Sequence, residues 1–198
     1  MASLALRDFV ARIAALVERT EDETTLLAEG AVALRALIAV DDWLPAAYAH
    51  PHPDHYQQYL LYADPRERFS VVSFVWGPGQ GTPIHDHTVW GLVGVLRGAE
   101  YAQAYRRTQD GRLVEDGVAL HLTPGTVAPV SPRLGDIHAV RNAYADRPSI
   151  SIHVYGGNIG GLERSVYSPD AAPRRFVSRY ANTQLPNLWL EPRETPLP

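Results

Sequence analysis

The sequence predicts a mainly β protein that begins with two helices. Apolar residues recur at helical spacing through residues 3–19 and again through residues 22–40, as expected for amphipathic helices. After Pro45 the pattern changes to short runs rich in Val, Ile, Tyr and Phe, which Gly, Pro, Asp and Asn separate at close intervals. Closely spaced runs of this kind are typical of an all-β sandwich or barrel.

Both N-terminal segments carry one apolar face. Their apolar side chains recur every three or four residues, which leaves charged residues such as Arg7, Arg12 and Glu18 for the solvent. We therefore expect one helix over residues 3–19 and a second over residues 22–40. The apolar residues on these faces are Leu6, Phe9, Ile13, Leu16, Leu27, Leu34 and Ile38.

Six clear runs with β character follow, and turn residues separate them. Gly77-Pro78-Gly79, Asp110-Gly111 and Pro124-Gly125 can supply the fixed or positive φ that tight turns require. Short connections favour antiparallel pairing of the strands on either side. The runs are residues 69–76, 89–96, 100–106, 117–122, 137–140 and 149–155.

No internal repeat or linker divides the chain, so we expect a single domain over residues 1–198. The helices are expected within residues 1–45 and the β-barrel within residues 55–170. Prolines are frequent at the end of the chain, between Pro192 and Pro198. We expect residues 171–198 to wrap the domain as extended chain or coil instead of adding a second core.

Composition excludes several classes of protein. The chain has no cysteine, which rules out disulfides, cysteine-ligated zinc or iron–sulfur centres and a cysteine nucleophile. The net charge of −4 comes without a Lys/Arg-rich block, so no nucleic-acid partner is implied. Arg7, Asp8 and Arg12 interrupt the N-terminal apolar stretch, which fits neither a signal peptide nor a membrane span. We expect a cytoplasmic protein that acts on a small molecule, with no membrane or protein partner implied.

Three histidines are candidate metal ligands. His85 and His87 are two residues apart, and on a strand this spacing sends both imidazoles to the same face. His138 begins another β run that ends near Asn142. Two unrelated strand histidines would give the same pair, so the pair alone leaves both interpretations open.

The residues around these histidines resemble the two motifs of the cupin family. That resemblance implies a jelly-roll barrel with a metal site inside it. The glutamate usually found in the first motif is absent, and Gly91 stands there. Three neutral ligands leave a divalent ion with open positions for substrate and dioxygen. The matching residues are Gly79, His85, His87, Gly98, Gly135, His138 and Asn142.

Within the cupins, three segments resemble those of the cysteine dioxygenase family of thiol dioxygenases. They are residues 85–88 (HDHT), 135–138 (GDIH) and 151–155 (SIHVY), and the resemblance covers roughly residues 55–170. It implies one Fe(II) per chain, bound by the three histidines, and oxidation of a small thiol acid by O2 to a sulfinate. It also implies a hydrogen-bonded relay of catalytic residues.

The relay residues implied by the resemblance are Ser151, His153 and Tyr155. Their spacing places all three on one face of a strand, opposite Ile150 and Ile152. Three polar groups in a row on a face inside a barrel must hydrogen-bond one another. The alternative is the solvated face of an amphipathic strand on which Tyr155 merely packs.

Two departures from the family pattern bear on the substrate. The cysteine that mammalian-type members crosslink to the relay tyrosine is absent, and Gln58 stands where those members place a carboxylate-binding arginine. Both features are similar to the bacterial branch represented by 3-mercaptopropionate dioxygenase. In that branch an arginine downstream of the relay tyrosine holds the carboxylate, and Arg164 fits this place. Alternatively, Arg164 is exposed or pairs with Glu163.

Several alternatives stay open on the sequence alone. The protein could prefer cysteine as its thiol, or it could be another three-histidine cupin that uses zinc, nickel or manganese. A non-catalytic cupin that senses a small ligand is the alternative outside the enzymes. Among the remaining residues, we expect His50, His52 and His55 in an exposed loop, and Trp76 and Trp90 in the barrel core.

Overall fold

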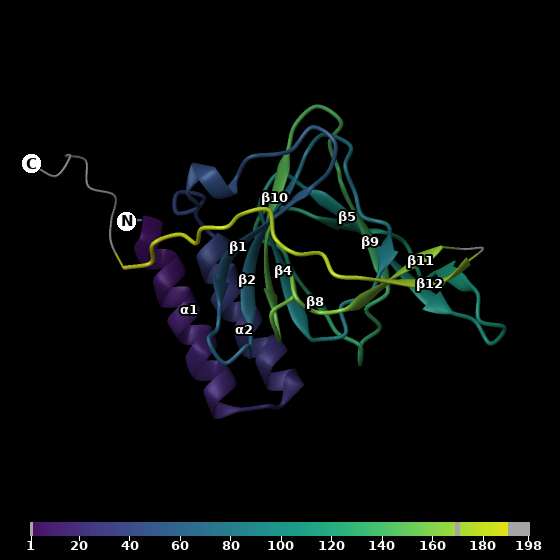
Figure 1. Ribbon diagram of the computed structural model, residues 1–198, viewed down its shortest axis with the longest axis horizontal. Coiled ribbons are helices and arrows are strands. Elements are labelled where there is room, and N and C mark those ends of the chain that lie inside the picture. Colours follow the sequence, from purple (N-terminus) through teal and green to yellow (C-terminus); the bar gives the residue numbers. More distant parts are fainter. Residues whose placement is uncertain (1, 169–170, 190–198) are drawn as a thin grey trace, which may run out of the picture.

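Two helices lie against one side of the molecule. The computed structural model describes residues 2–168 and 171–189. Helices α1 (Ala2–Arg19) and α2 (Glu23–Ile38) are followed by one 3-10 turn, η1 (Ala46–Tyr48), and the two helices pack beside the barrel (Figure 1). Asp22 caps α2 by accepting a hydrogen bond from the backbone N–H of Thr25. Within the described residues, neither helix combines the length and the apolar character needed to cross a membrane.

The strands form two antiparallel sheets. The first sheet has the order β1-β2-β10-β4-β8, and the second has the order β12-β11-β3-β9-β5-β6, with β7 also paired to β5. The strands of the first sheet are β1 (Gln57–Ala63), β2 (Ser70–Trp76), β10 (Ser149–Tyr155), β4 (Gly91–Arg97) and β8 (Val127–Val130). Those of the second are β12 (Ala171–Phe176), β11 (Arg164–Ser168), β3 (Ile84–His85), β9 (His138–Asn142), β5 (Glu100–Arg107), β6 (Leu113–Glu115) and β7 (Leu120–Leu122).

The central strands of the first sheet, β2, β10 and β4, are buried on both faces. In β2, Val71 and Val75 belong to the core shared with the helices, whereas Phe74 and Trp76 belong to a second core inside the barrel. Helix α2 approaches β4 so closely that a Cβ on Gly30 would lie 2.8 Å from Leu92 Cδ1. Burial on both faces explains why these strands read as nearly continuous apolar runs. Because the helices cover the outer face of this sheet, its inner face can carry a site inside the barrel.

The predicted fold, a mainly β jelly roll preceded by two helices, is confirmed. The helices end within two residues of their predicted bounds, and the run at 149–155 is β10 itself. The run at 117–122 shortens to β7, because Gly117 has a positive φ of 73° and belongs to a turn. The predicted runs do not include β1, β3, β6, β8, β11 and β12. A single domain over residues 1–198 stays a prediction.

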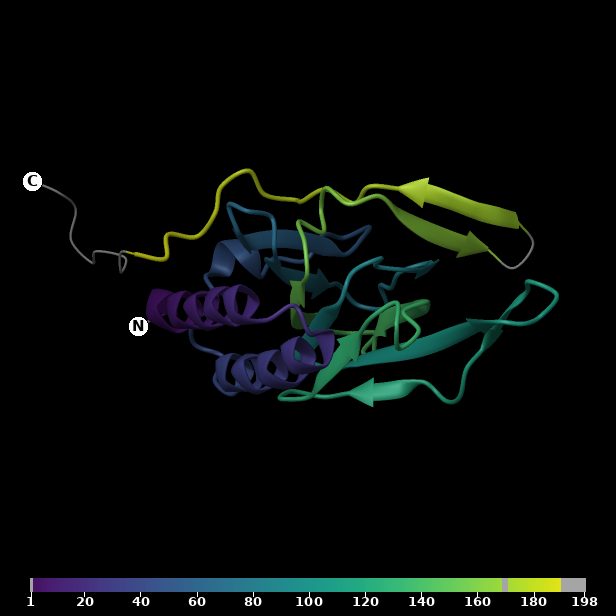
Figure 2. The same cartoon turned by 90° about the horizontal axis from the view of Figure 1, so that it is seen from below.

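The described part of the C-terminal segment begins with a strand and continues without regular secondary structure. Residues 171–176 form β12, an extended strand paired with β11 in the register that places Arg164 opposite Phe176. The following chain runs back over the barrel toward the helices (Figure 2). Ala181 N–H donates to Gln58 O, and the Asn182 side chain bonds both backbone groups of Leu60. Residues 190–198 of the predicted wrapping segment lie outside the described residues.

Candidate metal centre

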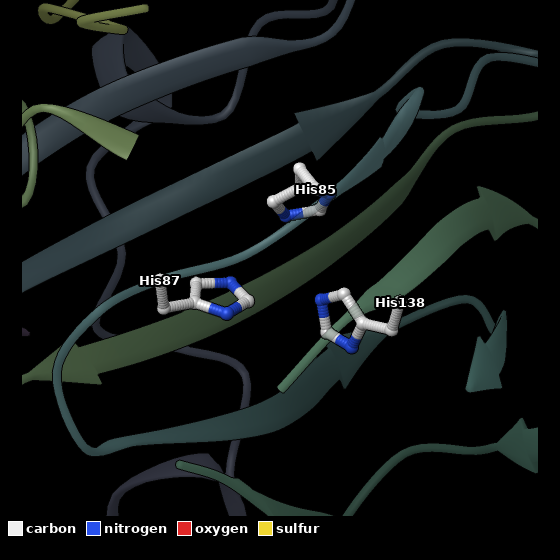
Figure 3. Close-up of side chains that lie close together, drawn as sticks. All are labelled: His85, His87 and His138. Carbon is white, nitrogen blue, oxygen red and sulfur yellow. The ribbon is translucent and has the colours of Figure 1, made fainter. Parts of the chain in front are cut away.

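The side chains of His85, His87 and His138 meet inside the barrel. Their ring centroids lie 4.8–4.9 Å apart in all three pairs, and one nitrogen of each ring lies within 4.8 Å of the other two. The rings surround a common space (Figure 3). Within the described residues, this is the one group of three or more His, Asp or Glu side chains arranged to hold a metal ion.

Strand pairing brings His85 to His138. β3 and β9 pair antiparallel with these two residues opposite each other. Upstream of β3, Thr82 locks the same register, since its N–H donates to Val140 O and its hydroxyl accepts from Val140 N–H. His85 Nδ1 lies 3.0 Å from Pro83 O, and this carbonyl can accept only from a protonated Nδ1. The Nε2 atom of His85 is therefore left with its lone pair for a metal.

A loop orients His87, contrary to the argument from strand alternation. β3 ends at His85, so the two histidines do not share a strand face. Instead, the buried carboxylate of Asp136 accepts hydrogen bonds from the N–H groups of His87 and Thr88, at 2.8 and 3.2 Å. Thr88 has a positive φ of 64°, which turns the chain directly after the ligand. Two backbone hydrogen bonds to one carboxylate thus fix the position of His87.

Burial keeps the three imidazoles neutral. It lowers the pKa of His85 to about 3 and that of His138 to about 4, and it places the pKa of His87 well below its usual value. The mutual repulsion of the rings adds to this effect for His85 and His87. Neutral imidazole is the ligand form that divalent metals bind. The donor set therefore fits a metal ion, and imidazole nitrogen alone does not select iron over zinc, copper or nickel.

A chain of hydrogen bonds lies beside the histidines. Ser151 Oγ lies 2.8 Å from His153 Nε2, and His153 Nδ1 lies 2.8 Å from the Tyr155 hydroxyl. The alternation predicted for β10 is therefore present, and the alternative of a solvated face is excluded because every residue of the strand is buried. Burial lowers the pKa of His153 to about 3 and raises that of Tyr155. Both side chains are thus neutral near pH 7.

Tyr155 occupies the space that a fourth ligand would need. Its ring stacks on His87, with centroids 5.3 Å apart. A Cβ on Gly91 would lie 2.7 Å from Tyr155 Cδ1 and 2.9 Å from Val130 Cγ2. No side chain larger than hydrogen fits at position 91 while the tyrosine stays in place. The glutamate that cupins usually carry at this position would therefore clash with Tyr155.

Arg164 is buried without a counter-ion. Its side chain is 3% exposed, and no carboxylate lies within ion-pair distance of it among the described residues. Nη2 donates to Ser178 Oγ at 2.6 Å, whereas Nε has no partner in the described part of the chain. Burial lowers the pKa of the guanidinium. This burial excludes the alternative of an exposed arginine. The alternative of a pair with Glu163 is excluded as well, because Glu163 pairs with Arg175 instead.

Gln58 and Arg164 meet at a serine of the C-terminal segment. Gln58 Nε2 donates to Ser178 Oγ at 3.1 Å and to Arg179 O at 2.9 Å. Ser178 thus contacts both residues that the sequence nominates for substrate binding. Ser178 and Asp136 are site residues that the sequence motifs did not predict. Asp136 could have been predicted, because it lies in the GDIH segment that resembles the family motif. No local sequence motif indicates Ser178.

One cavity collects the candidate residues. The cavity is lined by the three histidines and by Gln58, His153, Tyr155 and Arg164. Ser151 lies behind His153. Trp76 lines the cavity as well as packing in the barrel core, while Trp90 packs on the helix side. His50, His52 and His55 do not line it. The remaining lining residues are Tyr56, Phe74, Thr82, Val140 and Phe176.

Comparisons with known proteins identify the family. The family model described as cysteine dioxygenase type I matches residues 3–163. This range begins in α1, upstream of the range 55–170 that the motifs suggested, and it ends one residue before Arg164. It contains the three histidines and the residues Ser151, His153 and Tyr155.

Solved structures with similar chains include a double-stranded β-helix protein and a cupin. A conserved protein with a double-stranded β-helix domain from Klebsiella pneumoniae is 20% identical, with a TM-score of 0.48, over 65% of this chain and 99% of that one. A cupin superfamily protein from Desulfitobacterium hafniense is 15% identical, with a TM-score of 0.44, over 60% of this chain and 94% of that one. With the family model matching most of its length, the chain belongs to the cysteine dioxygenase type I family.

Proposed function

We propose that the protein is an iron(II)-dependent dioxygenase that oxidises a small thiol carboxylic acid, 3-mercaptopropionate, to its sulfinate. The observation that carries the proposal is Arg164, a buried guanidinium without a carboxylate partner among the described residues, in the same cavity as the three histidines. A buried charge is costly unless it is paired. A substrate carboxylate would supply the missing partner, and the planar guanidinium matches it with two parallel hydrogen bonds.

The reaction adds both atoms of dioxygen to the sulfur of the thiol. Sulfur loses four electrons, dioxygen gains them, and the thiol proton is released as the sulfinate forms. Iron(II) bound by His85, His87 and His138 would supply the redox centre that this reaction requires. Because the protein would supply only three ligands, such a centre would have room for substrate.

The side chains around the centre divide the remaining tasks. Arg164 holds the carboxylate, which fixes the distance of the thiol from the histidines. Tyr155 offers its hydroxyl to the reacting groups, since its ring lies against His87. His153 holds that hydroxyl through Nδ1, and Ser151 holds His153 through Nε2. Supporting hydrogen bonds of this kind fix the orientation of groups at metal sites generally.

The cavity favours an acid without an amino group. Among the described residues that line it, none is Asp or Glu, so the α-ammonium of cysteine would enter without an anionic partner and next to the Arg164 cation. The amide nitrogen of Gln58 already donates to Ser178 and Arg179. A direct contact of Gln58 with substrate and a cytoplasmic location stay predictions.

Oxygen consumption by protein reconstituted anaerobically with iron(II) tests the proposal. We expect 3-mercaptopropionate to be used at least about tenfold more efficiently in kcat/KM than L-cysteine, with sulfinate as the product. Arg164→Ala should lower kcat/KM for the acid about ten- to a hundredfold, because one hydrogen bond to a charged group contributes about 1.5–3 kcal/mol. Arg175→Ala, which removes an exposed arginine of β12, is the matched control and should have no effect.

Each other outcome points to a different protein. A preference for cysteine would keep the dioxygenase and refute the substrate. Full kcat/KM in Arg164→Ala would refute the role of that arginine. Metal binding without oxygen uptake would favour another three-histidine cupin, and a metal-free, inert protein would favour a small-ligand sensor.

A further inference from the structure

Glu100 is a buried acid that the proposed reaction does not yet use. It is the first residue of β5, and its side chain is 0% exposed. Neither carboxylate oxygen has a hydrogen-bond partner of good geometry among the described residues, and the same holds for Ser149 Oγ. A buried carboxylate in this condition is costly. A neutral, protonated Glu100 avoids that cost and carries a hydrogen-bond donor.

The fold places this acid behind the Ser151 end of the relay. Gly98, with a positive φ of 76°, makes the turn from β4 into β5, and a Cβ on it would lie 2.7 Å from Ser149 Cβ. The turn therefore packs directly against the start of β10. The carboxyl of Glu100 lies close enough to Ser149, Ser151 and Trp76 for each of them to influence its ionisation. Of these three neighbours, Ser151 is the one that belongs to the relay.

The hydrogen bonds of Ser151 allow two arrangements of the relay. A serine hydroxyl donates once and accepts twice, and Ser151 Oγ accepts from Trp76 Nε1 at 3.2 Å. A neutral His153 donates from one nitrogen and accepts at the other. Ser151 therefore either donates to His153 Nε2 or accepts from it. The remaining site on the serine is available to the carboxyl of Glu100, which lies near it.

We propose that Glu100 is a positioning residue that sets the direction of the hydrogen bonds along Ser151, His153 and Tyr155. When protonated, Glu100 donates to Ser151, Ser151 donates to His153 Nε2, and His153 Nδ1–H donates to the Tyr155 oxygen. The Tyr155 O–H is then free to donate into the cavity. When ionised, Glu100 accepts from Ser151, every bond reverses, and Tyr155 must donate to His153 instead.

Both forms of Glu100 are accessible near neutral pH. Burial raises the pKa of Glu100 to about 7, and the neighbouring groups of Ser151, Ser149 and Trp76 oppose this rise. The residues paired with Glu100 on the neighbouring strands, Asn142 and Leu122, carry no charge. The arrangement that frees Tyr155 therefore prevails at lower pH and is lost as the pH rises through the pKa of Glu100.

The tautomer of His153 reports the direction of the hydrogen bonds along the relay, and it can be measured without an assay of enzyme activity. We would record ¹⁵N-histidine NMR spectra of the full chain loaded with diamagnetic zinc(II), and assign His153 by its absence from His153→Gln. The wild type should change from mainly Nδ1–H at about pH 5.5 to mainly Nε2–H at about pH 8.5. Glu100→Gln should show the same tautomer at every pH in this range, because its amide does not ionise.

Two serine variants separate the proposed path from its surroundings. Ser151→Ala should abolish the change of tautomer, whereas Ser149→Ala, the matched control, should retain it. A wild-type tautomer that is constant over this range would overturn the proposal, as would a change that persists in Glu100→Gln or Ser151→Ala. The wild-type and serine results decide the matter even if Glu100→Gln does not fold.

The role of the relay in catalysis rests on the proposed function, and the pH profile of turnover tests it separately. Wild-type kcat should fall at least about threefold as Glu100 ionises, and Glu100→Gln should lack this decline. A protein that oxidises no thiol but shows the change of tautomer would refute the function and leave the positioning role intact. Active protein whose His153 tautomer never changes would refute the positioning role alone.

Discussion

Tyr155 joins two parts of the site through one side chain. Its ring lies against His87, and its hydroxyl lies 2.8 Å from His153 Nδ1. The ring therefore belongs to the packing of the metal centre, while the hydroxyl belongs to the hydrogen-bonded chain. A substitution that removes only the oxygen can separate these contributions.

Tyr155→Phe should lower turnover and leave the metal bound. The ring still packs on His87, but the hydrogen bond to the reacting groups, about 1.5–3 kcal/mol, is lost, so kcat should fall about ten- to a hundredfold. Steady-state oxygen consumption and metal analysis of the same preparation measure the two effects. Loss of metal would instead show that Tyr155 supports the centre itself.

His153 should make the metal-free protein sensitive to acid. Its pKa is about 3 in the folded protein, against 6.5 for the ordinary side chain. Between these values the unfolded chain binds more protons than the folded one, so stability falls as the pH falls through this range.

Urea denaturation of the metal-free wild type and of His153→Gln at two pH values measures this effect. Between about pH 7 and about pH 4 the wild type should lose on the order of 3 kcal/mol more than the variant. The other buried histidines are present in both proteins, so the difference isolates His153. Equal losses would mean that the ring is solvated or charged in the folded state.

At the level of elements, the C-terminal segment completes the cavity. β12 holds Phe176 opposite Arg164, and the chain just beyond it supplies Ser178. The Ser178 hydroxyl lies between Gln58 Nε2 and Arg164 Nη2. A segment that the sequence suggested as a mere wrapping therefore orients the residue proposed to bind the substrate.

Ser178→Ala should weaken substrate binding more than it slows the reaction. Arg164 loses the hydroxyl that holds Nη2, so KM for 3-mercaptopropionate should rise about threefold to tenfold, with little change in kcat or metal content. Ser168→Ala, at the exposed end of β11, provides the control. An unchanged KM would indicate that the guanidinium is held well enough by its packing on Phe176.

At the level of the whole molecule, the metal centre joins segments distant in sequence. His85 and His87 follow the loop after β2, whereas His138 begins β9 about fifty residues later, and the pairing of β3 with β9 brings them together. Metal bound there should resist unfolding, because the unfolded chain lacks this arrangement of ligands.

A saturating metal ion should therefore raise the melting temperature. At a free concentration a thousandfold above Kd, binding stabilises the folded state by about 4 kcal/mol, and for a chain of this size each kcal/mol shifts Tm by about 2–4 °C. Calorimetry with and without iron(II) or a chelator measures the shift. His138→Ala should abolish it, and an equal shift in that variant would place the metal elsewhere.

Much of the fold and the site could be predicted because the relevant patterns are local. Helical spacing of apolar residues predicted α1 and α2, and alternation along residues 149–155 predicted that Ser151, His153 and Tyr155 share one face. The spacing around His85, His87 and His138 predicted a metal cluster, which the geometry fits. The reason is that backbone periodicity alone decides which face of a helix or strand a side chain takes.

The tertiary structure decided what depends on contacts between distant residues. The strand argument for His87 failed because a two-residue strand ends before it, and Asp136, some fifty residues later, fixes its position. Likewise, Arg164 is buried without a counter-ion and Glu100 without a hydrogen-bond partner among the described residues, and both features arise only once the two sheets are assembled. The sequence by itself determined which donor atoms face inward. Only the folded barrel removes water from them, and that desolvation gives these residues their altered charge states and their chemistry.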